Sequence, residues 1–152
     1  MLSQDFLDLL ELFDRFSVRY LIVGGHAVSM YTEPRYTKDL DLWLERTPDN
    51  ARVVLRALHE FGFASTDLSV DDFTTPQFVV QLGVEPVRID LLTDLAGLSF
   101  SDCWQRRTEL KLASIRAAFI GLDDLIANKE KAGRPRDLAD AHELRRRKDQ
   151  GM

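Results

Sequence analysis

Two glycines and two aspartates in the first third of the sequence have the types and spacing of a site for an anion and a metal ion. Gly24 and Gly25 directly follow the apolar run at 20–23, and thirteen residues separate Gly25 from Asp39. Glycine lets the backbone approach a ligand closely, and free N–H groups at the start of a helix attract anions. A glycine pair after a strand is, on its own, more often a simple turn, so the prediction depends on the aspartates.

Asp39 and Asp41 are expected to share one face of a strand. Residues two apart in a strand point to the same side, so Leu40, Leu42 and Leu44 would face the core. Two carboxylates side by side repel each other, and one of them takes up a proton unless a cation lies between them. Mg²⁺ or Mn²⁺ meets that requirement, and Mg²⁺ in particular combines one or two carboxylates with phosphate oxygens and water. The pair therefore predicts a divalent metal site.

A third carboxylate, Asp90, interrupts the apolar segment at 87–92. Burying an aspartate in such a strand is costly unless it is paired or coordinates a metal. Arg88 lies on the same strand face, so a structural ion pair is the competing explanation. Because Asp39 and Asp41 already predict a metal site, we expect Asp90 to be its third ligand.

The elements that must position these residues follow from apolar periodicity and from glycine and proline at their boundaries. A helix is expected around Phe6, Leu9, Leu10 and Phe13, which are spaced to bury one face. The strands and helices together form a mixed sheet flanked by helices, an α/β or α+β fold. The other expected elements are strands over 19–23, 40–44, 77–82, 86–92, 109–112 and 116–120, with a hairpin joining the third and fourth, and helices over 26–31, 48–61, 122–132 and 136–148.

The composition is that of one globular domain spanning residues 1–152. Hydrophobic residues make up 45% and charged residues 30%, which argues against disorder. No apolar run approaches the roughly 20 residues that a membrane span needs, and the acidic N-terminal segment is unlike a secretory signal. The single Cys103 excludes an internal disulfide and is expected to be a small buried hydrophobe. We therefore expect a cytoplasmic protein that makes no membrane contact.

The apolar strand, the glycine pair, the Asp-x-Asp of residues 39–41 and the later Asp90 together resemble the signature of the nucleotidyltransferase superfamily. Two further segments, 35–39 and 125–140, resemble those of a minimal bacterial group related to the toxins of type IV toxin–antitoxin and abortive-infection systems. The resemblance implies a nucleotidyltransferase fold, a mixed sheet flanked by helices, that includes the C-terminal helices.

That resemblance also implies an enzyme that moves a nucleoside monophosphate from a nucleoside triphosphate to an acceptor hydroxyl and releases pyrophosphate. Asp39 and Asp41 would hold two Mg²⁺ ions. Asp90 would ligate the ion on the acceptor side and help to deprotonate the hydroxyl. The acceptor would be RNA or tRNA, a protein or a small molecule, and a toxin setting would add a partner antitoxin.

The triphosphate contacts implied by the resemblance begin with Gly24, Gly25 and Lys129. The two glycines would present backbone N–H groups to the triphosphate. Lys129 would reach it from the helix expected at 122–132, where the resembled group carries a lysine. A lone helical lysine is more often a solvated surface residue, which is the competing interpretation.

Arg35, Thr37 and His26 are the remaining nucleotide-binding candidates. Arg35 and Thr37 would touch phosphate, and Thr37 is also suited to tying the loop before the Asp-x-Asp. His26 stands where many members of the superfamily have serine, and it would either hydrogen-bond phosphate or cap the loop. A second departure from the pattern is Arg136, at a position where lysine is frequent.

Charge is distributed unevenly along the chain. Residues 1–103 carry 8 basic and 17 acidic side chains, whereas residues 104–152 carry 12 basic and 8 acidic ones. Asp137 and Asp140 are expected to be structural and to hold Lys129 or an arginine in place. The basic run at 145–148 is either a solvated helix end or a nucleic-acid contact.

Other nucleotide-binding classes fit poorly. The sequence after the first expected strand lacks the G-x-G-x-x-G of dinucleotide sites, and the chain has no Gly-Lys-Ser/Thr phosphate loop. One rival keeps the fold and loses the chemistry, namely a catalytically silent module that binds a nucleotide or a partner. The three carboxylates favour the enzyme.

Overall fold

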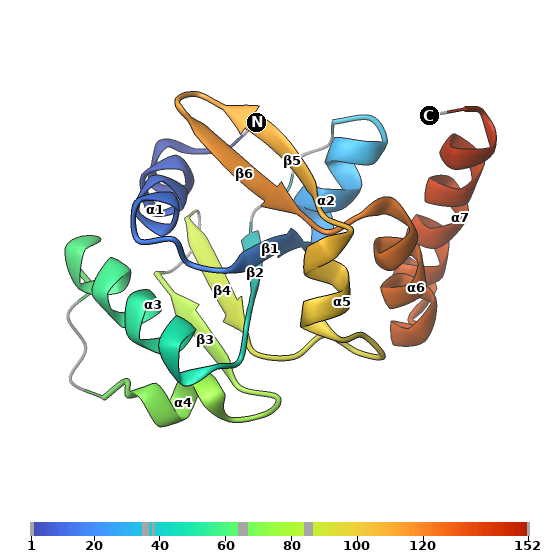
Figure 1. The fold of residues 1–152 in the computed structure, drawn as a ribbon. Coiled ribbons are helices and arrows are strands. Elements are labelled where there is room, and N and C mark those ends of the chain that lie inside the picture. The colour runs from blue at the N-terminus through green and yellow to red at the C-terminus, as the bar shows by residue number, and fades with distance from the viewer. Residues whose placement is uncertain (1, 35–36, 38, 64–66, 84–86, 152) are drawn as a thin grey trace.

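A mixed β-sheet runs through the middle of the computed structural model, which describes residues 2–34, 37, 39–63, 67–83 and 87–151 (Figure 1). Within those residues the strands follow the order β3-β4-β2-β1-β6-β5. β2 pairs parallel to β4 and antiparallel to β1, and β1 in turn pairs parallel to β6. The outer strands β3 and β5 each form an antiparallel pair with their neighbour. The strands are β1 (Tyr20–Val23), β2 (Asp39–Leu44), β3 (Val79–Leu82), β4 (Arg88–Leu92), β5 (Thr108–Leu112) and β6 (Ile115–Phe119).

Helices α1 (Gln4–Arg15) and α3 (Pro48–Glu60) lie on one side of the sheet (Figure 1). α1 begins at Ser3, whose hydroxyl accepts a hydrogen bond from the Phe6 N–H, and it buries the apolar face that the sequence predicted. α3 begins at Thr47, which accepts in the same way from the Asn50 N–H, with proline at the first helical position. The leucines of β2 alternate with its aspartates and are fully buried on the side opposite to them.

Helices α5 (Phe100–Gln105), α6 (Leu122–Ala132) and α7 (Pro135–Asp149) lie on the other side (Figure 1). α5 is anchored by an aromatic cluster in which Trp43 of β2 meets Phe100 edge to face at 5.1 Å and Phe100 stacks on Trp104 at 5.8 Å. α6 ends at Gly133, which adopts a left-handed conformation (φ +73°), and Pro135 starts α7. No helix among the described residues combines the length and apolar character that crossing a bilayer requires.

The strands and long helices predicted from the sequence are confirmed, including the hairpin of β3 and β4. β3 begins at Val79 and not at Gln77, because Gln77 has a left-handed backbone (φ +57°) that a strand cannot include. Two short helices were not predicted, α5 and α4 (Val70–Thr74), because periodicity needs more than one or two turns to show. α2 (Gly24–Tyr31) starts at the glycine pair, two residues earlier than predicted, and Cys103 is buried as expected.

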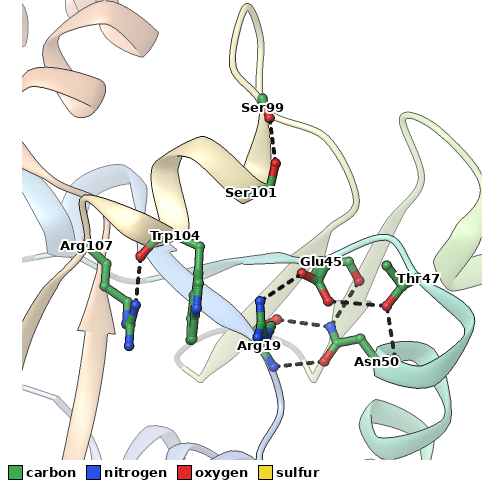
Figure 2. A network of polar contacts seen from close by, with 8 residues as sticks. All are labelled: Arg19, Glu45, Thr47, Asn50, Ser99, Ser101, Trp104 and Arg107. Atoms are coloured by element: carbon green, nitrogen blue, oxygen red, sulfur yellow. Dashed lines mark hydrogen bonds and ion pairs between the residues drawn. The ribbon is translucent and has the colours of Figure 1, made fainter.

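Asn50 ties the start of β1 to the end of β2 (Figure 2). Its side-chain oxygen accepts from the Arg19 N–H at 2.8 Å, and its side-chain nitrogen donates to the carbonyls of Arg19 and Glu45, both at 3.0 Å. Asn50 is only 5% exposed, so its side chain makes these three hydrogen bonds from a buried position. Since Tyr20 pairs with Leu44 immediately beyond them, Asn50 closes the end of the ladder that carries the aspartates.

We predict that Asn50→Ala lowers the free energy of unfolding by about 2 kcal/mol, because it removes three hydrogen bonds between α3 and the strand ends and takes away the side-chain acceptor of the Arg19 N–H. Urea denaturation followed by circular dichroism measures the change. Arg52→Ala on the same helix is the control, since it removes only an exposed ion pair with Asp49 and should cost less than about 0.5 kcal/mol. Similar losses in the two variants would contradict the role given to Asn50.

Candidate functional site

A cavity of about 460 Å³ lies on the side of the sheet covered by α6 and α7. It is lined by six of the nine residues that the sequence predicted for the site. Asp39 and Asp41 come from β2, Asp90 from β4, Gly24 and Gly25 from the start of α2, and Lys129 from α6. Residues far apart in the sequence therefore meet at one place, and these six come from four separate elements.

The pairing of β2 with β4 places the carboxylates side by side. The strands are parallel and in register, so Asp41 lies directly opposite Asp90 and Asp39 lies opposite Arg88. On the other edge of β2, Asp41 lies opposite Val23, the last residue of β1. In-register residues share a face of the sheet, and therefore all three carboxylates lie on the side of the cavity.

The glycine pair brings backbone against the carboxylates. Gly24 has a left-handed backbone (φ +68°), and a Cβ atom there would collide with the Asp41 carboxylate. A Cβ atom on Gly25 would lie 2.7 Å from the Thr37 Cγ2 atom, which is too close for any side chain. Only glycine fits at either position, and the first turn of α2 consequently lies beside Asp41 with its N–H groups at the cavity.

Asp41 carries the strongest electrostatic perturbation in the cavity. Burial raises its pKa to about 6, and repulsion from Asp90 and Asp39 adds to the effect. The positive charges of Lys129 and Arg88 oppose the shift without cancelling it. Nearby, the Asp39 Oδ1 atom is buried and has no hydrogen-bond partner among the described residues. The nearby side-chain cations do not fully compensate these carboxylates, and a hard divalent ion is the partner that such a donor set fits.

The ion pair that competed with the metal interpretation of Asp90 is present. Arg88 donates to both Asp90 oxygens, from Nε at 3.1 Å and from Nη2 at 3.0 Å. Its Nε atom also lies 3.9 Å from the Asp39 Oδ2 atom. No group of three or more carboxylate, imidazole or thiolate side chains is arranged to hold a metal ion in the part of the chain that the structure describes. The metal site thus remains a prediction.

Lys129 is held in the wall of the cavity by two buried carboxylates. Its Nζ atom lies 3.5 Å from Asp137 Oδ1 and 3.2 Å from Asp140 Oδ2. Asp137 also accepts from Arg134 at 2.7 Å, and this hydrogen bond lowers the pKa of the Asp137 carboxyl. The expected pairing of Asp137 and Asp140 with Lys129 is confirmed, and the neighbouring Lys131 is exposed.

Two of the predicted nucleotide contacts that the structure describes, His26 and Thr37, do not line the cavity. His26 lines a second cavity of about 310 Å³, and its ring meets Phe6 edge to face at 5.7 Å. Burial lowers the pKa of His26, and its Nε2 atom has no partner among the described residues. Thr37 lies beside Gly25, but it is not among the described residues that line the cavity with the three aspartates. Arg35 lies outside the described residues.

Besides Asp137 and Asp140, which were expected to be structural, four polar residues of the cavity were not predicted as site residues: Asp94, Asn128, Arg134 and Arg136. Asp94 lies two residues beyond β4, where the sequence offers no strand pattern, and it forms an ion pair with Arg46 at 3.6 Å. Its spacing of four from Asp90 was the available signal, since alternate positions share a face. The other three belong to the C-terminal segment 125–140 that carried the family resemblance.

The basic run at the end of α7 is neutralised within the chain. Each of its four side chains forms an ion pair with an acidic residue, and three of the pairs are at 2.6–2.8 Å. This favours a solvated helix end over a nucleic-acid contact. The pairs are Arg145 with Glu130, Arg146 with Glu143, Arg147 with Glu143 and Glu33, and Lys148 with Asp123.

Residues 3–151 match the family described as nucleotidyl transferase of unknown function (DUF2204), and the chain belongs to that family. A search of curated protein sequences found no match. The family and its description say nothing of a toxin–antitoxin setting, so that part of the resemblance stays a prediction.

Two solved structures show that the fold is the nucleotidyltransferase fold. TM1012 from Thermotoga maritima, itself only inferred to be a nucleotidyltransferase, aligns with a TM-score of 0.61 at 16% identity, over 99% of this chain and 96% of its own. The lincosamide antibiotic adenylyltransferase LnuA, solved with lincomycin bound, aligns with a TM-score of 0.59 at 15% identity, over 95% of this chain and 97% of its own. The expected fold is confirmed.

We predict that Asp41→Asn stabilises the metal-free protein at pH 8 by up to about 3 kcal/mol. The folded state binds the Asp41 proton more tightly than the unfolded state, whose aspartate pKa is near 3.9. The Asp41 contribution to stability is therefore lost as the pH rises from about 4 to above the folded pKa of about 6. Urea denaturation in EDTA between pH 4 and 8 should show the two proteins converging at low pH. Asp49→Asn, an exposed aspartate, is the control, and parallel pH profiles for D41N and wild type would contradict the prediction.

We predict that Lys129→Met lowers the free energy of unfolding by about 3 kcal/mol, because it leaves two buried carboxylates without their shared cation. Thermal denaturation measures the loss. Lys131→Met, an exposed change two residues along the same helix, should leave stability nearly unchanged. If the two variants melt at the same temperature, Lys129 is not the charge that balances Asp137 and Asp140.

Proposed function

We propose that this protein transfers a nucleoside monophosphate from a nucleoside triphosphate to an acceptor hydroxyl, with Mg²⁺ or Mn²⁺ as the cofactor. One observation carries the proposal. Asp39, Asp41 and Asp90 share one face of a sheet beside the glycine-bounded start of α2, and Asp41 lacks a cation sufficient to keep its pKa normal. The family to which the chain belongs supports the reaction class.

In this reaction the acceptor oxygen forms a bond to the α-phosphorus, and the bond from that phosphorus to the bridging oxygen breaks. Asp39 and Asp41 are the residues that would hold the divalent ions, which when bound neutralise charge on the attacking and leaving oxygens. Asp90 accepts the proton of the acceptor hydroxyl, and pyrophosphate leaves with the electron pair of the broken bond. The backbone N–H groups at Gly24 and Gly25 orient the triphosphate.

Lys129 supplies a positive charge at a fixed point of the cavity wall. Its ammonium group is shared between Asp137 and Asp140, so its position is set before a substrate arrives. An ammonium group has three donors, so Lys129 can donate to a triphosphate oxygen and keep both carboxylate partners. Arg134 and Arg136 line the same cavity and add positive charge for the pyrophosphate.

The acceptor that the geometry favours is a small molecule. A further cavity of about 400 Å³ shares Asp94 with the carboxylate cavity, and Trp43 lines it. Trp43 lies two positions beyond Asp41 on the same strand face, which is about 7 Å along the strand. Its indole N–H is buried and has no partner among the described residues, so an acceptor oxygen there would satisfy it. The hydroxyls of Ser99 and Ser101, which bond to each other at 3.2 Å, line the same cavity (Figure 2).

An RNA acceptor is less favoured, because the basic run of α7 is occupied by intramolecular ion pairs. LnuA, which shares the fold, acts on a small molecule, the lincosamide antibiotics. A protein or tRNA acceptor, together with a partner antitoxin, would instead place the chain in a toxin–antitoxin setting. The catalytically silent module is the remaining alternative.

A labelling experiment decides among these. The protein is incubated with each α-³²P nucleoside triphosphate, Mg²⁺ and three separate acceptor pools: total tRNA, protein depleted of small molecules, and a low-molecular-weight extract. We expect label to pass to the low-molecular-weight pool and to fall at least about 100-fold in Asp39→Asn and Asp41→Asn, the scale of loss seen when an electrostatic group of an active site is removed. Asp49→Asn, an exposed residue that lines neither of the two cavities, should transfer normally.

The other outcomes have distinct meanings. Label on tRNA or protein would overturn the small-molecule acceptor and keep the transferase. Triphosphate binding without transfer to any pool would favour the silent module, and transfer that survives both aspartate changes would remove these residues from the reaction.

A further inference from the structure

Arg88 is the one basic residue in β4, and it is in contact with two of the three carboxylates. It lies directly opposite Asp39 in the parallel register, two positions from Asp90 on the same strand face. Both Asp90 oxygens accept from it, at 3.1 and 3.0 Å, and its Nε atom lies 3.9 Å from Asp39. The guanidinium group of Arg88 therefore balances the negative charge of Asp90 and Asp39, as a divalent ion bound to them would.

The two members of this ion pair differ in exposure. The Asp90 side chain is 12% exposed, whereas the Arg88 side chain is 34% exposed. Arginine has a long, rotatable stem, so Arg88 can turn toward solvent without moving the strand. Asp90 cannot do so, and it needs a cation at all times because an unpaired buried carboxylate is costly. The pair is therefore expected to open when another cation replaces the guanidinium group or when Asp90 takes up a proton.

The arrangement also accounts for the absence of a ready metal site among the described residues. The fork of Arg88 fixes the orientation of the Asp90 carboxylate through two parallel hydrogen bonds. Asp41 lies directly across the register from Asp90 but receives only part of the positive charge, and its carboxylate remains under-compensated. The cluster is thus stable enough to fold, yet still short of positive charge.

We propose that Arg88 is an exchangeable counter-ion of the carboxylate cluster: it neutralises Asp90 and Asp39 in the metal-free protein and is displaced from them when a divalent ion binds. The inference rests on the proposed function, because it requires these carboxylates to bind the metal. Arg88 then acts as a positioning residue that lowers metal affinity while keeping the metal-free protein folded. The metal ion enters by exchange, because it must displace the guanidinium group of Arg88 from the carboxylates.

The test uses Mn²⁺ alone, with no nucleotide, and counts free Mn²⁺ by electron paramagnetic resonance. Arg88→Gln keeps a polar, though shorter, side chain and removes the charge. We expect R88Q to bind Mn²⁺ about 10- to 100-fold more tightly than wild type, the range that loss of one charge-assisted competitor implies. Without metal, R88Q should melt at a lower temperature than wild type, and saturating Mn²⁺ should remove this difference. Arg88→Lys, which keeps the charge but loses the fork, should fall between the two and serves if R88Q does not fold.

Arg106 provides a matched control. It forms the same two-point ion pair with a buried aspartate, Asp124, at 3.0 and 2.9 Å, and neither residue lines the carboxylate cavity. Arg106→Gln should lower the melting temperature in the same way, but Mn²⁺ should not restore it and Mn²⁺ affinity should equal that of wild type. A variant pair that differs only in location thus separates a counter-ion of the cluster from an ordinary ion pair.

Failure of this inference can be distinguished from failure of the proposed function. If Asp41→Asn abolishes Mn²⁺ binding while R88Q binds Mn²⁺ as wild type or more weakly, the metal site stands and the exchange role of Arg88 is overturned. If Mn²⁺ binding is absent in wild type and R88Q, or is unchanged in Asp39→Asn and Asp41→Asn, the carboxylates are not a metal site and both proposals are overturned.

Discussion

Repulsion among three carboxylates on one sheet face is the interaction on which the rest of the structure depends. In-register pairing of β2 with β4 puts Asp41 against Asp90, and the strand period adds Asp39 to the same side. A folded protein tolerates such crowding only when positive charge or protons are close by. The raised pKa of Asp41 shows that the protein itself supplies less than the cluster needs. Several residues around the cavity supply positive charge to this cluster.

Positive charge is supplied in two layers that differ in how firmly they are held. Arg88 touches the cluster directly and is partly exposed. Lys129 is buried and is engaged by Asp137 and Asp140, so most of its charge is balanced before it reaches the cluster. Arg134, whose side chain is exposed, forms an ion pair with Asp137 at 2.7 Å. Acidic and basic side chains thus alternate with increasing distance from β2. The carboxylates of β2 are left with the least positive charge to balance them, which is what a site for a cation requires.

The parts of the fold that follow from local sequence were predictable. The apolar spacing in α1, the Thr47-Pro48 start of α3 and the aspartate alternation in β2 each depend on neighbours within a few residues. The same local logic predicted that Asp39 and Asp41 share a face and that Asp90 belongs with them. The Lys129 pairing was predictable too, because its partners lie in the adjoining segment of the chain.

What the sequence did not predict depends on contacts between distant residues. The register that sets Arg88 opposite Asp39 is fixed by strand pairing across some fifty residues, and no spacing rule reveals it. His26 follows the glycine pair directly, yet the turn of α2 carries it away from the cavity and against Phe6. Asp94 joined the cavity because the chain continues past β4 along the same face, beyond the last residue with a strand pattern. In each case tertiary packing, and not local preference, decided the position.

The dependence of Lys129 on α7 has a consequence for how the protein matures during synthesis. The glycine pair and the aspartates of β2 are synthesised before Asp90, which follows about fifty residues later. Asp137 and Asp140 are synthesised about fifty residues later still, and until then Lys129 lacks the two carboxylates that hold it in the cavity wall. Domains generally fold as units in step with translation. The carboxylates of the cavity are therefore present in the nascent chain before the segment that fixes Lys129, so the complete cavity wall forms only after α7 has been made.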